Sequence, residues 1–235
     1  MIPLKDDNPT TSKPIITYCL IGICVLVFLV ELSSSSYRNG SFFYSFGLIP
    51  SVFLGKLKLS HDLYVIPSYF TLITSMFVHG GFMHLIGNML YMWIFADNIE
   101  DSIGKTKFLI FYLLCGVGAA MAQVFTDTSS QIPMVGASGA IGGVLGAYLI
   151  NYPKAKVLVL IPFGFFSQLI KIKAIYVLGF WFVLQFINSV LSNSGGGGVA
   201  YSAHIGGFIC GIILILFFNK KKIKIMNKVI KGPWE

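Results

Sequence analysis

Long apolar runs separated by shorter polar stretches occupy most of the chain between residues 15 and 218. An α-helix needs about 20 predominantly apolar residues to cross the hydrocarbon core of a bilayer. The pattern predicts six crossings, at Ile15–Leu32, Gly81–Ala96, Phe108–Phe125, Ser138–Asn151, Ala174–Leu191 and Val199–Phe218. We therefore expect an all-α polytopic membrane protein with a bundle of six transmembrane helices.

The fourth apolar run is too short for a simple crossing. Its 14 residues would form a helix of about 21 Å at 1.5 Å per residue, against a hydrocarbon core of about 30 Å. A helix end inside the membrane requires irregular backbone, which is tolerated only where it lines a protein cavity. We expect this helix to start below the membrane surface, beside such a cavity.

The segments between the apolar runs divide the chain further. Residues 33–68 form a long mixed segment rich in Ser, Phe and Leu, which we expect to lie in the membrane interface. Residues 152–173 are expected to be a loop around a short apolar stretch, and the glycines at 195–198 a flexible turn. The predicted organisation is an N-terminal tail (1–14), a six-helix domain (15–218) and a basic C-terminal tail (219–235).

The composition supports a membrane protein and excludes several other classes. Hydrophobic residues make up 55% of the chain and charged residues 11%, whereas soluble domains average roughly 25% charged. With a mean hydropathy of +0.79, disorder, a collagen-like chain and a coiled coil are excluded, and a soluble enzyme nearly so. The four cysteines lie within apolar runs, so we expect buried thiols without a metal or redox role. No cofactor is expected.

The net charge of +8 follows from the distribution of lysines. Fourteen of the Lys and Arg residues lie in the N-terminal tail, residues 97–107, residues 152–173 and the C-terminal tail, and three in the alternate segments. Cytoplasmic loops carry such an excess, so both termini should be cytoplasmic and no nucleic-acid partner is implied. We expect a prokaryotic plasma membrane, and expect the tail lysines to contact anionic headgroups. The N-terminus lacks the order of a signal peptide, so the first apolar run should be retained.

Histidines within the apolar runs are the first candidates for chemistry. His84 and His204 fall inside predicted spans, where an ionisable side chain is costly and is a functional hypothesis by default. His84 and Asn88 are four residues apart and so share one helix face, whereas His79 would lie about 140° from His84 on an ideal helix. We expect His79 to precede or cap that helix.

The fourth run adds a serine and a glycine stripe. Ser138 begins it, and glycines follow at 139, 142, 143 and 146. His204 in the sixth run likewise shares its face with Gly207 and Gly211. Such small residues could form no more than an ordinary helix-packing face.

Taken together, these residues could form a nucleophilic site. Histidine is the usual base that activates a serine nucleophile, and separate donors stabilise the oxyanion. The prediction assigns Ser138 as nucleophile, His204 as base, and His84, Asn88 and the Ser138 N–H as oxyanion donors. No Asp or Glu lies within the second to sixth predicted spans, so the unit would be a dyad.

Three motifs resemble those of the rhomboid family of intramembrane serine proteases. Residues 136–140 (Gly-Ala-Ser-Gly-Ala) resemble the nucleophile motif, residues 79–88 an H-x4-H-x3-N pattern, and residues 203–207 the helix that carries the base. The resemblance implies an endopeptidase that cleaves single-pass membrane proteins without a metal, in a six-helix bundle whose fifth helix is a lateral gate. It also makes His79, Gly136 and Gly139 supporting residues. Many members carry an aromatic residue four positions after the serine, where this chain has Gly142.

Two other functions remain open at this level. A catalytically inactive rhomboid-like protein would bind membrane-protein clients, although such relatives lose the serine or histidine that this chain keeps. A channel or transporter would also combine polar residues with a broken helix. This chain shows neither internal repeats nor a carboxylate within the second to sixth predicted spans. Reaction with a serine-directed probe would separate these alternatives.

Overall fold

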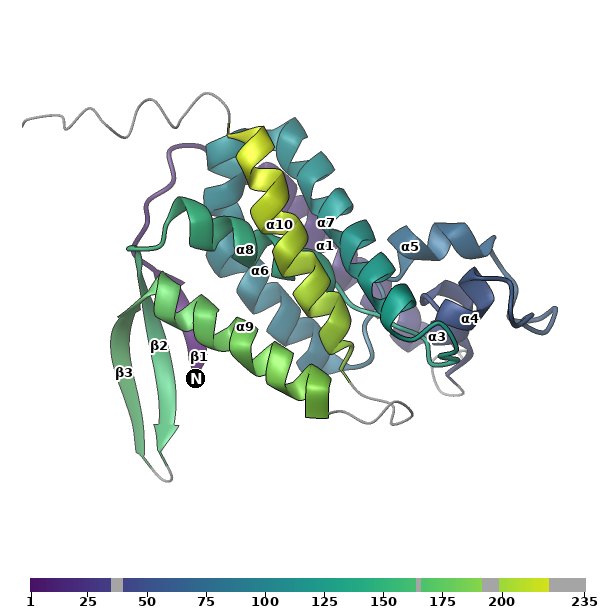
Figure 1. The fold of residues 1–235 in the computed structure, drawn as a ribbon. Coiled ribbons are helices and arrows are strands. Elements are labelled where there is room, and N and C mark those ends of the chain that lie inside the picture. The colour runs from purple at the N-terminus through teal and green to yellow at the C-terminus, as the bar shows by residue number, and fades with distance from the viewer. Residues whose placement is uncertain (35–39, 164–165, 192–198, 220–235) are drawn as a thin grey trace, which may run out of the picture.

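Each of the six apolar runs forms a helix in the computed structural model, which describes residues 1–34, 40–163, 166–191 and 199–219. The helices are α1 (Ile15–Ser33), α6 (Phe82–Ile103), α7 (Lys105–Thr126), α8 (Ser138–Asn151), α9 (Ala174–Leu191) and α10 (Tyr201–Phe218). Within the described residues, α1, α7, α9 and α10 are long and apolar enough to cross a membrane. The short α8 has the predicted 14 residues and lies inside the bundle (Figure 1).

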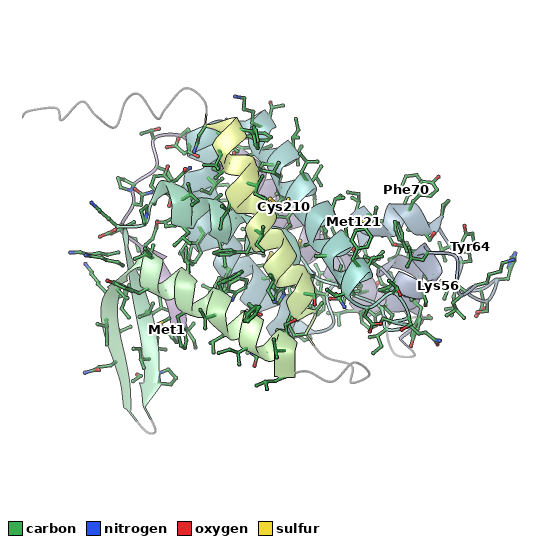
Figure 2. All side chains as sticks on the ribbon, viewed as in Figure 1. Met1, Lys56, Tyr64, Phe70, Met121 and Cys210 are labelled. Carbon is green, nitrogen blue, oxygen red and sulfur yellow. The ribbon has the colours of Figure 1, made fainter. Side chains whose placement is uncertain are left out.

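The exterior of the bundle is strongly apolar. Large hydrophobic side chains are exposed along the helices, among them Met83, Phe125 and Leu191 at 80%, 71% and 72%, and side chains project from every element in Figure 2. Apolar patches of this extent on a soluble monomer would cause association. Lipid is the environment that such a surface fits.

The helix α6 ends at Ile103, about two turns beyond the predicted end at Ala96 at 3.6 residues per turn, because its acidic residues bind the start of the chain. Glu100 accepts hydrogen bonds from the N–H groups of Ile16 and Thr17 at 3.0 and 2.8 Å. These N–H groups belong to the first turn of α1, which has no intrahelical acceptors for them and favours a nearby anion. Asp101, one residue further, accepts hydrogen bonds from Thr11 and Ser12.

A small antiparallel sheet corrects the all-α prediction. It has the order β1 (Ile2–Asp6), β2 (Lys156–Phe163) and β3 (Phe166–Lys173), and lies at one side of the bundle (Figure 1). The predicted loop at 152–173 is therefore wrong over most of its length. Its β-branched residues alternate with period two, which favours a strand with one buried face. Val157 and Val159 are fully buried.

The first strand joins the N-terminal segment to the body of the protein. Pro3 pairs with Val159, and Asp6 accepts a hydrogen bond from the hydroxyl of Tyr148 on α8. Burial raises the pKa of the Asp6 carboxyl. The segment expected to be a tail thus contributes to the fold, whereas the glycine turn and the C-terminal lysines lie outside the described residues.

Residues 40–74 form four short helices on the opposite side of the bundle from the sheet (Figure 1). They are α3 (Ser41–Phe46), α4 (Pro50–Phe53), the 3-10 helix η1 (Ser68–Phe70) and α5 (Thr71–Thr74). Tyr64 and Phe70 project from this region away from the bundle (Figure 2), whereas Lys56 donates a hydrogen bond to the Thr128 hydroxyl at 2.8 Å. Backbone hydrogen bonds in both directions between Leu48 and Met134 join it to the segment that precedes α8.

The glycine stripe brings α8 and α10 into backbone contact. A Cβ atom on Gly207 would lie 1.9 Å from the carbonyl oxygen of Gly139, and one on Gly211 would lie 1.9 Å from that of Gly143. Only glycine permits this approach. The helices that carry Ser138 and His204 are therefore held in one register by their backbones.

The cysteines agree with the prediction only in part. Cys24 and Cys115 are buried, Cys210 is half-buried, and all four are free thiols. Cys19 is exposed, which contradicts the expectation of a buried thiol. Its side chain lies on the outer face of α1, where a thiol in contact with lipid is as well accommodated as one in a protein core.

Candidate active site

Ser138 is the first residue of α8, and the backbone before it is shaped by Gly136. Gly136 has φ +119°, a conformation that favours glycine, and its N–H donates to the Ser75 carbonyl oxygen at 2.8 Å. A Cβ atom on Gly136 would lie 2.6 Å from Nε2 of His84. Glycine at this position therefore lets the His84 ring lie directly against the turn that presents Ser138.

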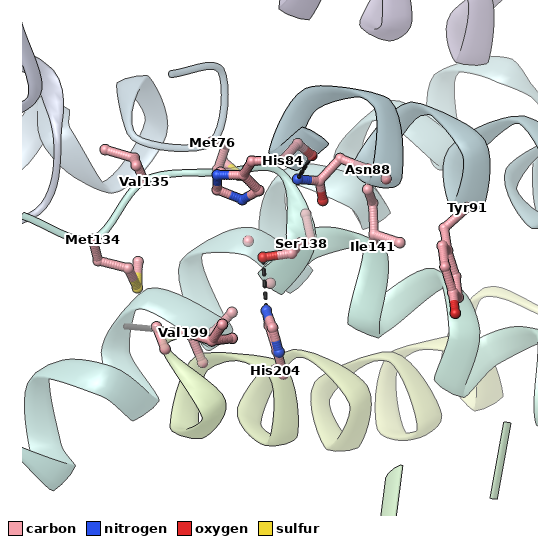
Figure 3. A pocket seen from close by; sticks show the side chains of 18 of the residues that line it. Met76, His84, Asn88, Tyr91, Met134, Val135, Ser138, Ile141, Val199 and His204 are labelled. Atoms are coloured by element: carbon pink, nitrogen blue, oxygen red, sulfur yellow. Dashed lines mark hydrogen bonds between the residues drawn. The ribbon is translucent and has the colours of Figure 1, made fainter. Parts of the chain in front are cut away.

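Ser138 and His204 form a hydrogen-bonded pair. The distance from Ser138 Oγ to His204 Nε2 is 2.7 Å, and the His204 side chain is buried. Figure 3 shows Ser138 between His204 on one side and His84 and Asn88 on the other. The structure thus brings together the four residues that the sequence nominated.

The other ring nitrogen of His204 has a partner that the sequence analysis missed. Nδ1 lies 2.8 Å from Oε1 of Gln185 on α9. An amide oxygen only accepts hydrogen bonds, so Nδ1 carries the proton and Nε2 is free to accept from the serine hydroxyl. The available signal was an amide within the mostly apolar fifth run, which also holds Asn188 and Ser189.

Aromatic contact with His204 also comes from outside α8. The Trp181 ring lies 5.7 Å from the His204 ring at an interplanar angle of 35°, and Tyr201 approaches it edge-on at 6.4 Å. A Cβ atom on Gly142 would lie only 2.9 Å from the His204 carbonyl oxygen. The close approach of α8 and α10 therefore excludes a side chain at residue 142, and α9 supplies the ring instead.

His84 and Asn88 project from the first turns of α6 toward Ser138. Nδ1 of His84 accepts the Gly80 N–H at 3.3 Å, so the ring proton of the neutral form lies on Nε2, the nitrogen nearest Gly136. Asn88 Nδ2 donates to the His84 carbonyl oxygen at 2.9 Å, and its second amide hydrogen remains available. Both side chains can donate hydrogen bonds into the space beside Ser138.

His79 occupies a different position. It lies in the turn before α6, fully buried, where its N–H donates to Glu31 Oε1 at 3.1 Å and its Nδ1 to the Phe77 carbonyl oxygen at 3.1 Å. Its ring packs edge-on against His84 at 5.3 Å. His79 therefore joins the turn to α1 and supports His84, and it does not line the cavity.

A cavity of about 640 Å³ opens beside the pair. Ser138, His204, His84, Asn88, Gly136 and Gly139 all line it, with Trp181 at its α9 side and several methionines and apolar residues around them. Within the described part of the chain, no group of three or more His, Cys, Asp or Glu side chains could hold a metal ion. The arrangement offers a hydroxyl, a neutral imidazole and hydrogen-bond donors around a cavity that is lined mainly by apolar residues.

Comparison with known proteins identifies the family. Residues 67–221 match the model of the Rhomboid domain. The chain is 28% identical to the protein named Rhomboid protein 1, mitochondrial, of Saccharomyces cerevisiae, over 93% of this chain and 58% of the relative. It is 32% identical to Rhomboid protease GluP of Bacillus subtilis, over 85% and 34%, and 28% identical to Rhomboid protease AarA of Providencia stuartii, over 92% and 76%.

The family match covers most of the helical bundle, and the chain spans only part of the length of two of these relatives. The chain spans 58% of the length of the yeast relative and 34% of that of GluP. The matched domain begins before η1 and includes α6 to α10, the helices that carry the Ser138 cavity. The chain therefore belongs to the rhomboid family and is a multi-pass membrane protein.

Proposed function

We propose that this protein is an intramembrane serine endopeptidase with a Ser138–His204 dyad. The observation that carries the proposal is the 2.7 Å contact between Ser138 Oγ and His204 Nε2, two residues that line one cavity. A serine becomes nucleophilic when an adjacent base can accept its proton, and the Gln185 contact leaves Nε2 free for that task. Two of the relatives carry the name rhomboid protease.

The geometry suggests the order of events. His204 Nε2 accepts the Ser138 proton as Oγ attacks the carbonyl carbon of the peptide, and the resulting oxyanion receives hydrogen bonds. His84 Nε2–H, the free amide hydrogen of Asn88 and the N–H of Ser138 are the proposed donors. Since α8 begins at Ser138, its first N–H groups lack intrahelical acceptors and its positive dipole end faces the charge. The imidazolium then protonates the leaving amine, and water hydrolyses the acyl-enzyme.

The proposed substrate is a transmembrane segment of a single-pass protein. The cavity is lined mainly by apolar residues and bordered by α9, whose outer surface is exposed. A helix would have to unwind to present a peptide bond to Ser138, so segments with low helical stability should be preferred. Resemblance to the rhomboid family also implies a small residue before the cleaved bond. The proposed partners are these substrates and the lipid bilayer.

The proposed topology has six crossings, with α6 and α8 completing the set, and both termini in the cytoplasm. The lysine distribution supports this orientation. Cysteines placed at the start of α7 and in the segment that follows it, in a background without the native cysteines, test it. Gln131→Cys should react with an impermeant thiol reagent from outside, and Lys105→Cys only after permeabilisation. The reverse labelling pattern would refute this orientation. The location in a prokaryotic plasma membrane stays a prediction.

A fluorophosphonate probe on purified protein tests the enzymatic proposal. We expect covalent labelling of the wild type and none of Ser138→Ala, together with cleavage of a model transmembrane substrate in proteoliposomes. Labelling without cleavage of any transmembrane substrate would indicate a reactive serine that acts on another class of substrate. Absence of both would favour the client-binding or transport alternatives.

A further inference from the structure

Gln185 is the residue outside the proposed dyad that contacts the catalytic imidazole most directly. Among the described residues, the hydrogen-bond partners of the His204 ring are Ser138 on one nitrogen and Gln185 on the other. The titratable side chains facing this ring are His84 from α6 and Tyr201 from the start of α10. From α8 and α9 it meets the uncharged Ser138, Gln185 and Trp181.

The Gln185 amide performs two tasks for a base in this position. Its oxygen selects the tautomer with hydrogen on Nδ1, which leaves a lone pair on Nε2 for the serine proton. It also limits rotation of the ring about its Cβ bond, since turning would break the 2.8 Å contact. In serine proteases with a triad, a carboxylate performs both tasks; here a neutral amide replaces it.

The location of Gln185 gives this contact a further consequence. The fully buried residues of α9 are Ala174, Val177 and Leu178, all in its first half. In the half that carries Gln185, Val183, Phe186 and Val190 are 51%, 57% and 70% exposed. The bond that orients the base therefore depends on the least packed part of the helix that borders the cavity.

We propose that Gln185 is a positioning residue for His204, and that it makes a competent dyad depend on α9 being seated against the bundle. The proposal rests on the proposed protease function. It explains how the chain orients its histidine although residue 142 carries no side chain. Displacement of α9 would remove the Nδ1 acceptor and the Trp181 ring together and would leave the His204 ring unoriented.

Three variants test the proposal. Gln185→Leu keeps the size of the side chain but removes the acceptor, and we expect kcat to fall by about 10–10²-fold, as for loss of one hydrogen bond to a charged group, with KM little changed. Gln185→Glu keeps an acceptor at this position and adds charge, so its kcat should be well above that of Gln185→Leu. Because a carboxylate stabilises the protonated imidazole, the acid limb of its pH–rate profile should move to higher pH. Val183→Ala is the matched control on the same half of α9.

The rate of fluorophosphonate labelling provides a readout independent of substrate entry. Gln185→Leu should slow it by a factor similar to the fall in kcat, because activation of Ser138 itself is impaired, whereas Val183→Ala should not. Wild-type kcat and labelling in Gln185→Leu would overturn the proposal, as would equal losses in Val183→Ala or a Gln185→Glu variant as slow as Gln185→Leu with an unmoved acid limb. If Gln185→Leu fails to fold, the profile of Gln185→Glu decides. A wild type that does not label would refute the protease function itself.

Discussion

His204 is held by two interfaces that differ in how closely they pack. One is the contact between α8 and α10, and the other is the contact of α9 with the bundle. Between α8 and α10 the backbones touch, because a Cβ atom at Gly207 or Gly211 would lie 1.9 Å from a carbonyl oxygen on α8. Along α9, a Cβ atom on Gly179 would meet nothing within 4 Å. The distance between Ser138 and His204 is therefore set by the rigid packing of the α8 and α10 backbones. The orientation of the ring depends on side chains from a loosely packed helix.

The largest effects are expected for Ser138 and His204, which lie on the tightly packed helices α8 and α10. Ser138→Ala and His204→Ala should each lower kcat by about 10⁴-fold or more, and the double variant should be little worse, because members of one nucleophilic unit are not additive. Cleavage rates per mole of folded protein and melting temperatures, measured on the same preparations, check this. Additive losses would indicate that the two residues act separately.

The donors on α6 should give the next largest loss. Removing an oxyanion donor costs about 10²–10³ in kcat, and we expect somewhat less for His84→Ala and for Asn88→Ala because the Ser138 N–H shares the task. KM should be nearly unchanged.

His79→Ala is the control for the donor variants, since its side chain lies outside the cavity. It should lower the melting temperature more than kcat. Normal kcat in the folded fractions of both donor variants would show that His84 and Asn88 only connect helices.

Two glycine substitutions test the packing contrast directly. Gly207→Ala places a methyl group against the Gly139 carbonyl, so we expect a loss of about 1–3 kcal/mol in stability from overpacking and lower activity as the dyad separates. Gly179→Ala should keep or slightly raise stability, since alanine exceeds glycine in helix propensity by about 1 kcal/mol. Thermal unfolding of both variants decides, and similar losses would remove the distinction between the two regions.

The smallest effect concerns the ring that α9 supplies. Trp181→Ala should lower kcat by at most about tenfold, the equivalent of the 0.5–1.5 kcal/mol typical of an aromatic pair. The neighbouring Phe180→Ala, at a side chain that is 52% exposed, should leave kcat unchanged. Steady-state kinetics at saturating substrate separates the two, and equal effects would mean that α9 acts only by its position.

The sequence alone determined the parts of this protein that depend on local pattern. The bounds of α8 and α9 agree residue for residue with the apolar runs, because the lack of competing hydrogen-bond partners in lipid forces such runs into helices. The spacing of His84 and Asn88 placed both on one helix face, and the short fourth run indicated a buried start for Ser138. The roles proposed for these residues stay predictions.

The tertiary structure decided everything that depends on partners distant in the chain. The β1 strand pairs with residues more than 150 positions away, α6 extends because Glu100 binds the first turn of α1, and His204 finds Gln185 on another helix. An amide in an apolar run carries no local signal that tells which helix it will face. Which hydrogen bond forms between two helices depends on how their backbones pack. That packing follows from contacts such as those of the glycines on α8 and α10.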